Sequence, residues 1–154
     1  MDASYTSSIT EFAIVLAGFS GLVIAIGSKG GKSSPLTKHR TLCLLSFSFA
    51  AAFGSLLPAL ALSFGIPNIW TFSSYGLICI LLVAVIVVHL SARLLLNEEE
   101  RKKLAWYMYI LIYWVNAFLV FLLALMPIAG LFFIALVWQL IVSAILFTRL
   151  ILQS

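Results

Sequence analysis

The side chains in this sequence that could carry out chemistry are few and scattered. His89 lies one helical turn before Arg93, and the two cysteines, Cys43 and Cys79, are far apart in the chain. Catalysis needs a nucleophile beside a base, and a metal site needs closely spaced ligands; neither pattern occurs here. A proton relay through His89 would also need a carboxylate at matching depth in a membrane helix, and none is present. The sequence therefore predicts no enzyme, no metal and no cofactor, with both thiols free and buried.

A second short motif resembles the end of a phosphate-binding loop. Gly31-Lys32-Ser33 has the correct final residues, but Ile26 stands where the pattern needs its first glycine. An apolar segment precedes the motif, whereas a phosphate-binding loop follows a strand. We therefore expect a basic polar loop at 28–40 near anionic lipid headgroups and no nucleotide site. Nothing in the sequence indicates nucleic-acid binding.

The composition indicates an integral membrane protein. Of the 154 residues, 64% are hydrophobic and 9% are charged. Soluble domains carry about 25% charged residues. At this length the chain holds one transmembrane domain, residues 1–154, with no room for a soluble catalytic domain.

The apolar segments predict an all-α bundle of five transmembrane helices. Each segment is long enough to cross a hydrocarbon core of about 30 Å. Polar loops at 28–40 and 97–103 separate some of them, and turn residues at 65–68 and 126–130 separate the others. The expected helices cover about 9–27, 41–64, 69–96, 104–125 and 131–152.

The basic residues orient this bundle. In the five-helix topology all nine lie on one side of the membrane, which places the N-terminus outside and the C-terminus inside. Basic residues near a membrane surface attract anionic lipid headgroups. The residues expected to do so are Lys29, Lys32, Lys38, Arg40, Arg93, Arg101, Lys102, Lys103 and Arg149.

Small residues predict close helix packing in two places. Glu11 follows Ser8 in the spacing of a capping box, so it is expected to cap the first helix. Small side chains at four-residue spacing let helices approach closely, although they are also common in membrane helices generally. In the first helix these residues are Ala13, Ala17, Gly18, Gly21 and Ala25, and in the second they include Ser48 and Ser55.

Two amides are expected in the interior of the membrane. Asn116 and Gln139 stand at similar distances from the turn near Ile128, so an antiparallel hairpin places them at the same depth. Such a pair can hydrogen-bond between helices. Trp114 and Trp138 accompany them, and their buried N–H groups would need partners, either at a helix or subunit interface or in contact with a cofactor or lipid. We expect the amides to join helices, with lining of a polar path as the alternative.

The chain also resembles a loose group of small bacterial membrane proteins of no assigned activity. The resemblance rests on short segments: 16–22 in the first helix, 56–58, Asn116-Ala117, Gln139, and 147–150. It implies a bacterial inner-membrane location and no catalytic role.

These observations predict a non-catalytic multi-pass membrane protein that acts through helix packing, as a homo-oligomer or as a subunit of a membrane complex. The alternative is a small oligomeric channel or transporter. Its pore would be lined by the serine-rich second helix together with Asn116 and Gln139.

Overall fold

The fold of the described chain is helical throughout. The computed structural model describes residues 11, 14, 18, 34–104 and 106–152, and within these ranges only helices and short connections occur. Four helical segments are long and apolar enough to cross a membrane: α2 (Pro35–Ser63), α3 (Ile69–Leu95), Trp106–Leu125 and α7 (Ala129–Leu152). The third consists of α5 (Trp106–Tyr109), the π-helix η2 (Ile110–Val115) and α6 (Asn116–Leu125). The predicted class, a multi-pass helical membrane protein, is confirmed at this level.

The predicted first helix, 9–27, lies mostly outside the described residues. Glu11, Ile14 and Gly18 are helical and exposed. Among the described residues, none would come within 4 Å of a Cβ atom added at Gly18, so none of them packs closely against it. Ala13, Ala17, Gly21 and Ala25 lie outside the described residues, and their packing role stays a prediction.

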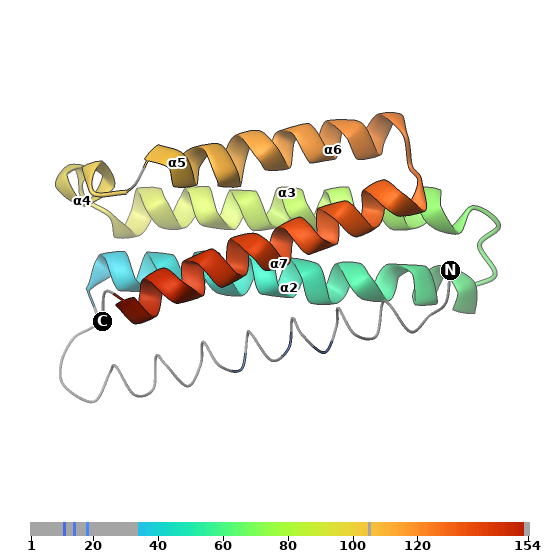
Figure 1. Cartoon of the computed structure of the whole chain (residues 1–154), viewed down its shortest axis with the longest axis horizontal. Helices are drawn as coiled ribbons and strands as arrows, with labels where there is room; N and C mark the ends of the chain where they lie inside the picture. Colours follow the sequence, from blue (N-terminus) through green and yellow to red (C-terminus); the bar gives the residue numbers. More distant parts are fainter. Residues whose placement is uncertain (1–10, 12–13, 15–17, 19–33, 105, 153–154) are drawn as a thin grey trace.

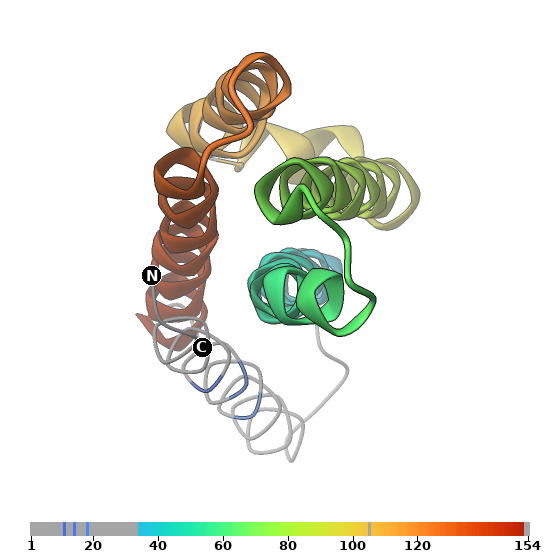
Figure 2. The same cartoon turned by 90° about the vertical axis from the view of Figure 1, so that its right-hand side faces the viewer.

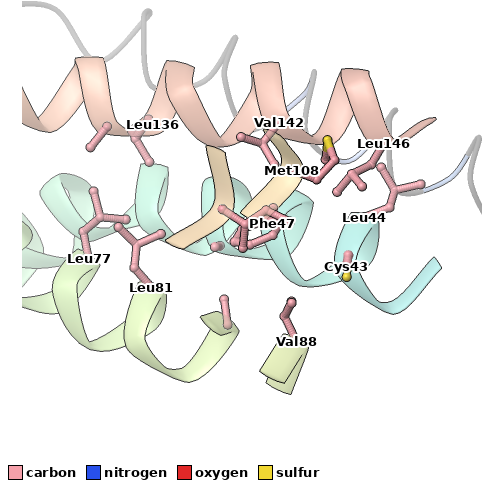
Figure 3. Close-up of a cluster of buried hydrophobic side chains, with 14 of the residues drawn as sticks. Cys43, Leu44, Phe47, Leu77, Leu81, Val88, Met108, Leu136, Val142 and Leu146 are labelled. Atoms are coloured by element: carbon pink, nitrogen blue, oxygen red, sulfur yellow. The ribbon is translucent and has the colours of Figure 1, made fainter. Parts of the chain in front are cut away.

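The four long segments form a packed bundle. Helix α2 contacts α3 and α7, α3 also contacts α6 and α7, and α6 contacts α7 (Figure 2). Helices α2 and α3 lie side by side along most of their length, whereas α7 crosses from the α6 end of the bundle toward the start of α2 (Figure 1). Apolar side chains from α2, α3 and α7 fill the space between them (Figure 3); the core includes Leu44, Phe47, Leu77, Leu81, Phe132, Leu136 and Val142.

Helix α2 begins six residues earlier than the sequence analysis predicted. Ser34 caps the helix by accepting from the N–H of Thr37 at 3.2 Å, and Pro35 occupies the first helical position. Proline suits this position because its missing N–H would be unpaired there in any case. The prediction treated 28–40 as one loop and was wrong for 35–40. As a result, Lys38, His39 and Arg40 lie on the first two turns of a helix.

The turn between α2 and α3 matches the prediction. Gly65 has φ of 64°, a conformation that glycine adopts without strain. The N–H of Ile66 donates to Ala61 O at 2.9 Å and that of Gly65 to Leu62 O at 3.1 Å, the paired bonds of a Schellman cap. The chain therefore reverses direction within a few residues after α2 ends, and α3 can pack antiparallel to α2.

The charged segment 97–103 contains a short helix where a loop was expected. Helix α4 (Glu98–Lys102) begins where Glu100 Oε2 accepts from the N–H of Asn97 at 3.1 Å. Arg101 donates to the carbonyls of Arg93 at 2.9 Å and Leu96 at 3.2 Å, which lack helical partners at the end of α3. The segment thus terminates α3. The other predicted boundaries, at 104 and 131, move by two residues.

Candidate functional site

The predicted amide pair is present in the middle of the bundle. Gln139 Nε2 on α7 donates to Asn116 Oδ1 on α6 at 2.7 Å, and the two residues are 0% and 2% exposed. Asn116 Nδ2 donates in turn to Ile112 O at 2.7 Å. The hydrogen bond joins two helices that diverge along their length, so it holds them where apolar contact is sparse.

The π-helix η2 depends on the same asparagine. The backbone N–H of Asn116 bonds to Tyr113 O, while its side chain donates to Ile112 O, which a regular α-helix would pair with the backbone N–H. Asn116 directly follows η2, so its two hydrogen bonds stabilise the C-terminal end of this irregular turn. Turns of this kind are frequent at functional sites, and this one was not predicted from the sequence.

Several polar atoms in the described interior have no hydrogen-bond partner. Ser48 on α2 and Ser143 on α7 are fully buried, and the Oε1 of Gln139 and the Nε1 of Trp138 are also unpaired. Ala51 and Ala52 pack with Leu140, so α2 and α7 meet at this depth. The serine-rich face of α2 therefore lies against α7.

This arrangement bears on the channel hypothesis. Ser48, Ser55, Asn116 and Gln139 are all at most 2% exposed, inside a single copy of the chain. Ser55 donates to Ala52 O at 2.7 Å, close to Pro58, which interrupts the helical bonding of α2. A pore between subunits lined by these side chains would require each bundle to open, so the geometry favours the structural role.

A second polar cluster lies near the basic end of α2. His39 Nδ1 is 2.8 Å from Ser91 Oγ on α3, and Ser91 Oγ donates its hydrogen to Val88 O at 2.8 Å. Ser91 Oγ therefore lies within hydrogen-bonding distance of both His39 Nδ1 and Val88 O, and the roles in its bond to His39 depend on the imidazole tautomer. The other ring nitrogen, Nε2, lies 3.5 Å from Cys43 Sγ. The thiol and imidazole are within hydrogen-bonding reach, and Ser91 fixes the ring.

This cluster was not predicted, because His39 was expected in a loop. The available signal was the four-residue spacing of His39 and Cys43, which puts both on one helical face once Pro35 is taken as the start. The cluster resembles an oriented cysteine–histidine pair, but Cys43 is only 2% exposed. Its geometry therefore joins α2 to α3, and no substrate path to the sulfur is present in the described structure.

Aromatic and basic side chains gather at the same end of the bundle. The His89 ring meets the Tyr113 ring edge-on with 6.3 Å between centroids, and Tyr109 stacks on Tyr113 at 5.7 Å. Arg149 on α7 lies 4.8 Å from the centre of the Tyr107 ring on α5. The start of α2, the helix α4 and the end of α7 all lie at this end (Figure 1). Every described basic residue is therefore at one end, as the topology predicted.

Two apolar grooves open on the outside of the bundle. The first, of about 610 Å³, runs between α2 and α3 and is lined by Ser46, Phe49, Phe53, Leu60, Cys79 and Val83 among others. The second, of about 420 Å³, runs between α3 and the η2–α6 segment, with Leu82, Val85, Asn116 and Ala117 among its lining residues. Cys79 is exposed in the first groove, so the prediction that both thiols are buried was wrong for this residue.

Two further sequence expectations concern single side chains and metal ions. Trp114 is 74% exposed, so it faces outward from η2 and is not part of the described helix–helix interior. Among the described residues, no group of three or more His, Cys, Asp or Glu side chains could hold a metal ion.

The fold and these sites define a small multi-pass helical membrane protein with a buried hydrogen bond between Asn116 and Gln139 in its interior. Comparisons with family models, curated proteins and solved structures give no match. The function must therefore be argued from the geometry.

Proposed function

We propose that this chain is a non-catalytic membrane protein that acts through helix packing, either as a homo-oligomer or as a subunit of a membrane complex. The observation that carries this proposal is the groove between α2 and α3. Its lining extends along α2 from Ser46 to Leu60, a rise of about 21 Å at about 1.5 Å per residue. That length covers most of a hydrocarbon core of about 30 Å. A transmembrane helix from a neighbouring subunit fits such a groove.

The interior polar groups support the same role. Asn116, Gln139, His39 and Ser91 are engaged in bonds that connect helices of one chain. A catalytic site would expose at least one such group to a substrate. These bonds instead fix the relative positions of the helices, and hence the shape of the groove that a partner helix would meet.

The proposed setting is a bacterial inner membrane, with the basic end on the cytoplasmic side. Lys38, Arg93, Lys102 and Lys103 are exposed at that end, where they can contact anionic headgroups. The asymmetric distribution of basic residues supports this orientation.

The test compares two tryptophan substitutions on α3. Val83 and Ile86 are both exposed, but only Val83 lines the α2–α3 groove. The mass of the purified full-length protein is measured by native mass spectrometry in a mild detergent. We expect the wild type to be an oligomer or to retain a partner, Val83→Trp to dissociate it, and Ile86→Trp to leave it intact.

Two outcomes would contradict the proposal. A wild-type protein that is strictly monomeric and carries no co-purifying protein would refute it. Equal dissociation by Val83→Trp and Ile86→Trp would show that the groove is not the site of packing. Thermal unfolding of both variants, compared with wild type, ensures that a change of mass reflects association and not loss of fold.

A further inference from the structure

The second groove differs from the first in length and in the residues at its mouth. Along the η2–α6 segment its lining runs from Tyr113 to Ala124, a rise of about 16 Å at about 1.5 Å per residue. One leaflet of a bilayer contributes about 15 Å, half of a hydrocarbon core of about 30 Å. The groove is therefore as long as the hydrocarbon part of one leaflet, and its Tyr113 end, about two helical turns inside the start of α5, is the end nearer the basic residues.

The floor and walls of this groove are apolar. Leu82 and Val85 line it from α3, and Val120 and Phe121 from α6. Asn116 is the polar exception, but both ends of its amide are already bonded, Oδ1 to Gln139 and Nδ2 to Ile112. The groove therefore offers apolar contact along its length, as the alkyl chain of a lipid requires.

The mouth of the groove is amphipathic. Tyr113 lines the groove and contacts the rings of His89 and Tyr109. Tyrosine side chains favour the headgroup level of a bilayer. Arg93 is exposed one helical turn beyond His89 on the same face of α3. A lipid whose tail fills the groove would thus place its headgroup beside an arginine, a histidine and two tyrosines.

The charge at the mouth is positive. Helix α4 follows α3, and its three glutamates, Glu98 to Glu100, are balanced by the three basic residues Arg101, Lys102 and Lys103. The guanidinium of Arg101 also caps the end of α3. Arg93 therefore determines the sign of the local charge, which complements a phosphate.

The π-helical turn η2 affects the direction in which Tyr113 faces. A π-turn carries one more residue than an α-helical turn, which rotates the preceding residues by about 100°. Since Asn116 stabilises η2, the asparagine indirectly determines that Tyr113 faces both His89 and the groove. This is a reason for an irregular turn at this place in the helix.

From these observations we propose that the groove between α3 and the η2–α6 segment binds an anionic phospholipid, with one acyl chain along Leu82, Val85 and Val120 and its phosphate at Arg93. The site does not rest on the proposed helix-packing role, because it lies in a different groove. It is a specific lipid site and adds to the general attraction of basic residues for headgroups.

The experiment measures lipid retention by the purified full-length protein. The protein is titrated with phosphatidylglycerol or with phosphatidylcholine of the same acyl chains, and native mass spectrometry counts the lipid molecules that stay bound. We expect wild type to retain one phosphatidylglycerol in preference to phosphatidylcholine by about fivefold, because one basic residue near the surface contributes about that preference. Arg93→Gln removes this preference, and Arg93→Lys, which keeps the positive charge, restores it.

A second pair of variants tests the tail site. Ala117 and Cys79 are both small and exposed, and each lines one groove. Ala117→Phe fills the proposed groove and lowers retention of both lipids by about tenfold, the loss expected when about two methylene groups lose their contacts. Cys79→Phe fills the other groove and leaves retention unchanged.

Three results would overturn the proposal. They are equal retention of the two lipids by wild type, an unchanged preference in Arg93→Gln, and equal losses in Ala117→Phe and Cys79→Phe. The first and third would identify the bound molecules as bulk annular lipid. Thermal unfolding of each variant in lipid-free detergent, matched to wild type, confirms that the folds are intact. Each of these results would refute the lipid site and leave the proposed helix packing in the α2–α3 groove untouched, because the two proposals concern different grooves.

Discussion

The two hairpins of this bundle are held together in different ways. Helices α2 and α3 approach closely where glycines remove the side chain: a Cβ added at Gly54 would lie 2.7 Å from Leu77 Cδ1, and one at Gly76 would lie 2.9 Å from Leu57 Cδ1. The η2–α6 segment and α7 diverge from their turn (Figure 1) and are joined in mid-bundle by the Asn116–Gln139 hydrogen bond. The first hairpin is held mainly by shape, with the His39–Ser91 contact near its basic end, whereas the second is joined by a polar bond in mid-bundle.

The difference has a physical reason. Lipid tails are as apolar as leucine, so burial from water does not drive helices together inside a membrane. Two helices must then either approach closely enough for dispersion contacts or share a hydrogen bond that lipid cannot replace. The first hairpin presents two continuous faces to each other, whereas the second needs a bond because its helices separate.

The largest expected effect comes from filling the close contact of the first hairpin. Gly54→Leu would overpack the space next to Leu77 and Leu136, and overpacking costs about 1–3 kcal/mol. Gly130→Leu is the control, because nothing lies within 4 Å of a Cβ at that residue. Unfolding free energies in detergent measure both. A stability of Gly54→Leu equal to that of Gly130→Leu would mean that the close approach does not hold α2 to α3.

A smaller effect is expected from removing one partner of the polar bond. Asn116→Leu leaves the buried Gln139 amide and the Ile112 carbonyl without the partner that each now has, which costs about 1–2 kcal/mol. Gln139→Leu and the double variant complete a mutant cycle. We expect a coupling energy of about 0.6 kcal/mol and at most about 1.7 kcal/mol, the average and the maximum for hydrogen bonds between membrane helices. A coupling energy of zero would mean that the Asn116–Gln139 hydrogen bond does not hold α6 to α7.

The smallest effect concerns the basic end of the second hairpin. Arg149 lies over the Tyr107 ring and joins the end of α7 to α5. Exposed contacts of this kind contribute about 0.5–1 kcal/mol. Tyr107→Leu should therefore lower stability by that amount in wild type and by nothing in an Arg149→Gln background, as measured by unfolding in detergent. Tyr107→Phe keeps the ring and should preserve stability, so a loss in this variant would point to the hydroxyl instead.

The sequence predicted those features that depend on depth and composition. Each long apolar run within residues 34–152 that the structure describes forms a helix, because a backbone in lipid must satisfy its own hydrogen bonds. The Asn116–Gln139 pair followed from counting residues back to the turn, since two antiparallel helices rise equally from their hairpin. The clustering of basic residues at one end followed from the same topology.

Other features required the packed structure. The stripe of small residues on α2 indicated close packing, but which glycine meets a neighbour depends on the crossing of α2, α3 and α7, and the residue with that contact is Gly54. His39 entered the interior because a cap at Ser34 extended α2 backward, and its partner Ser91 is distant in the sequence. The exposure of Cys79 likewise depends on which side of α3 the neighbouring helices leave uncovered.

The sequence by itself determined that the chain enters a membrane as helices, where its turns fall and which amides share a depth, because these are properties of single segments with a fixed rise per residue. Only the tertiary structure decided which helix faces make contact, where η2 departs from the α-helix and where the two outer grooves lie. Those features depend on the rotation of each helix about its axis, which in lipid is determined by neighbouring side chains and not by a general preference for burial.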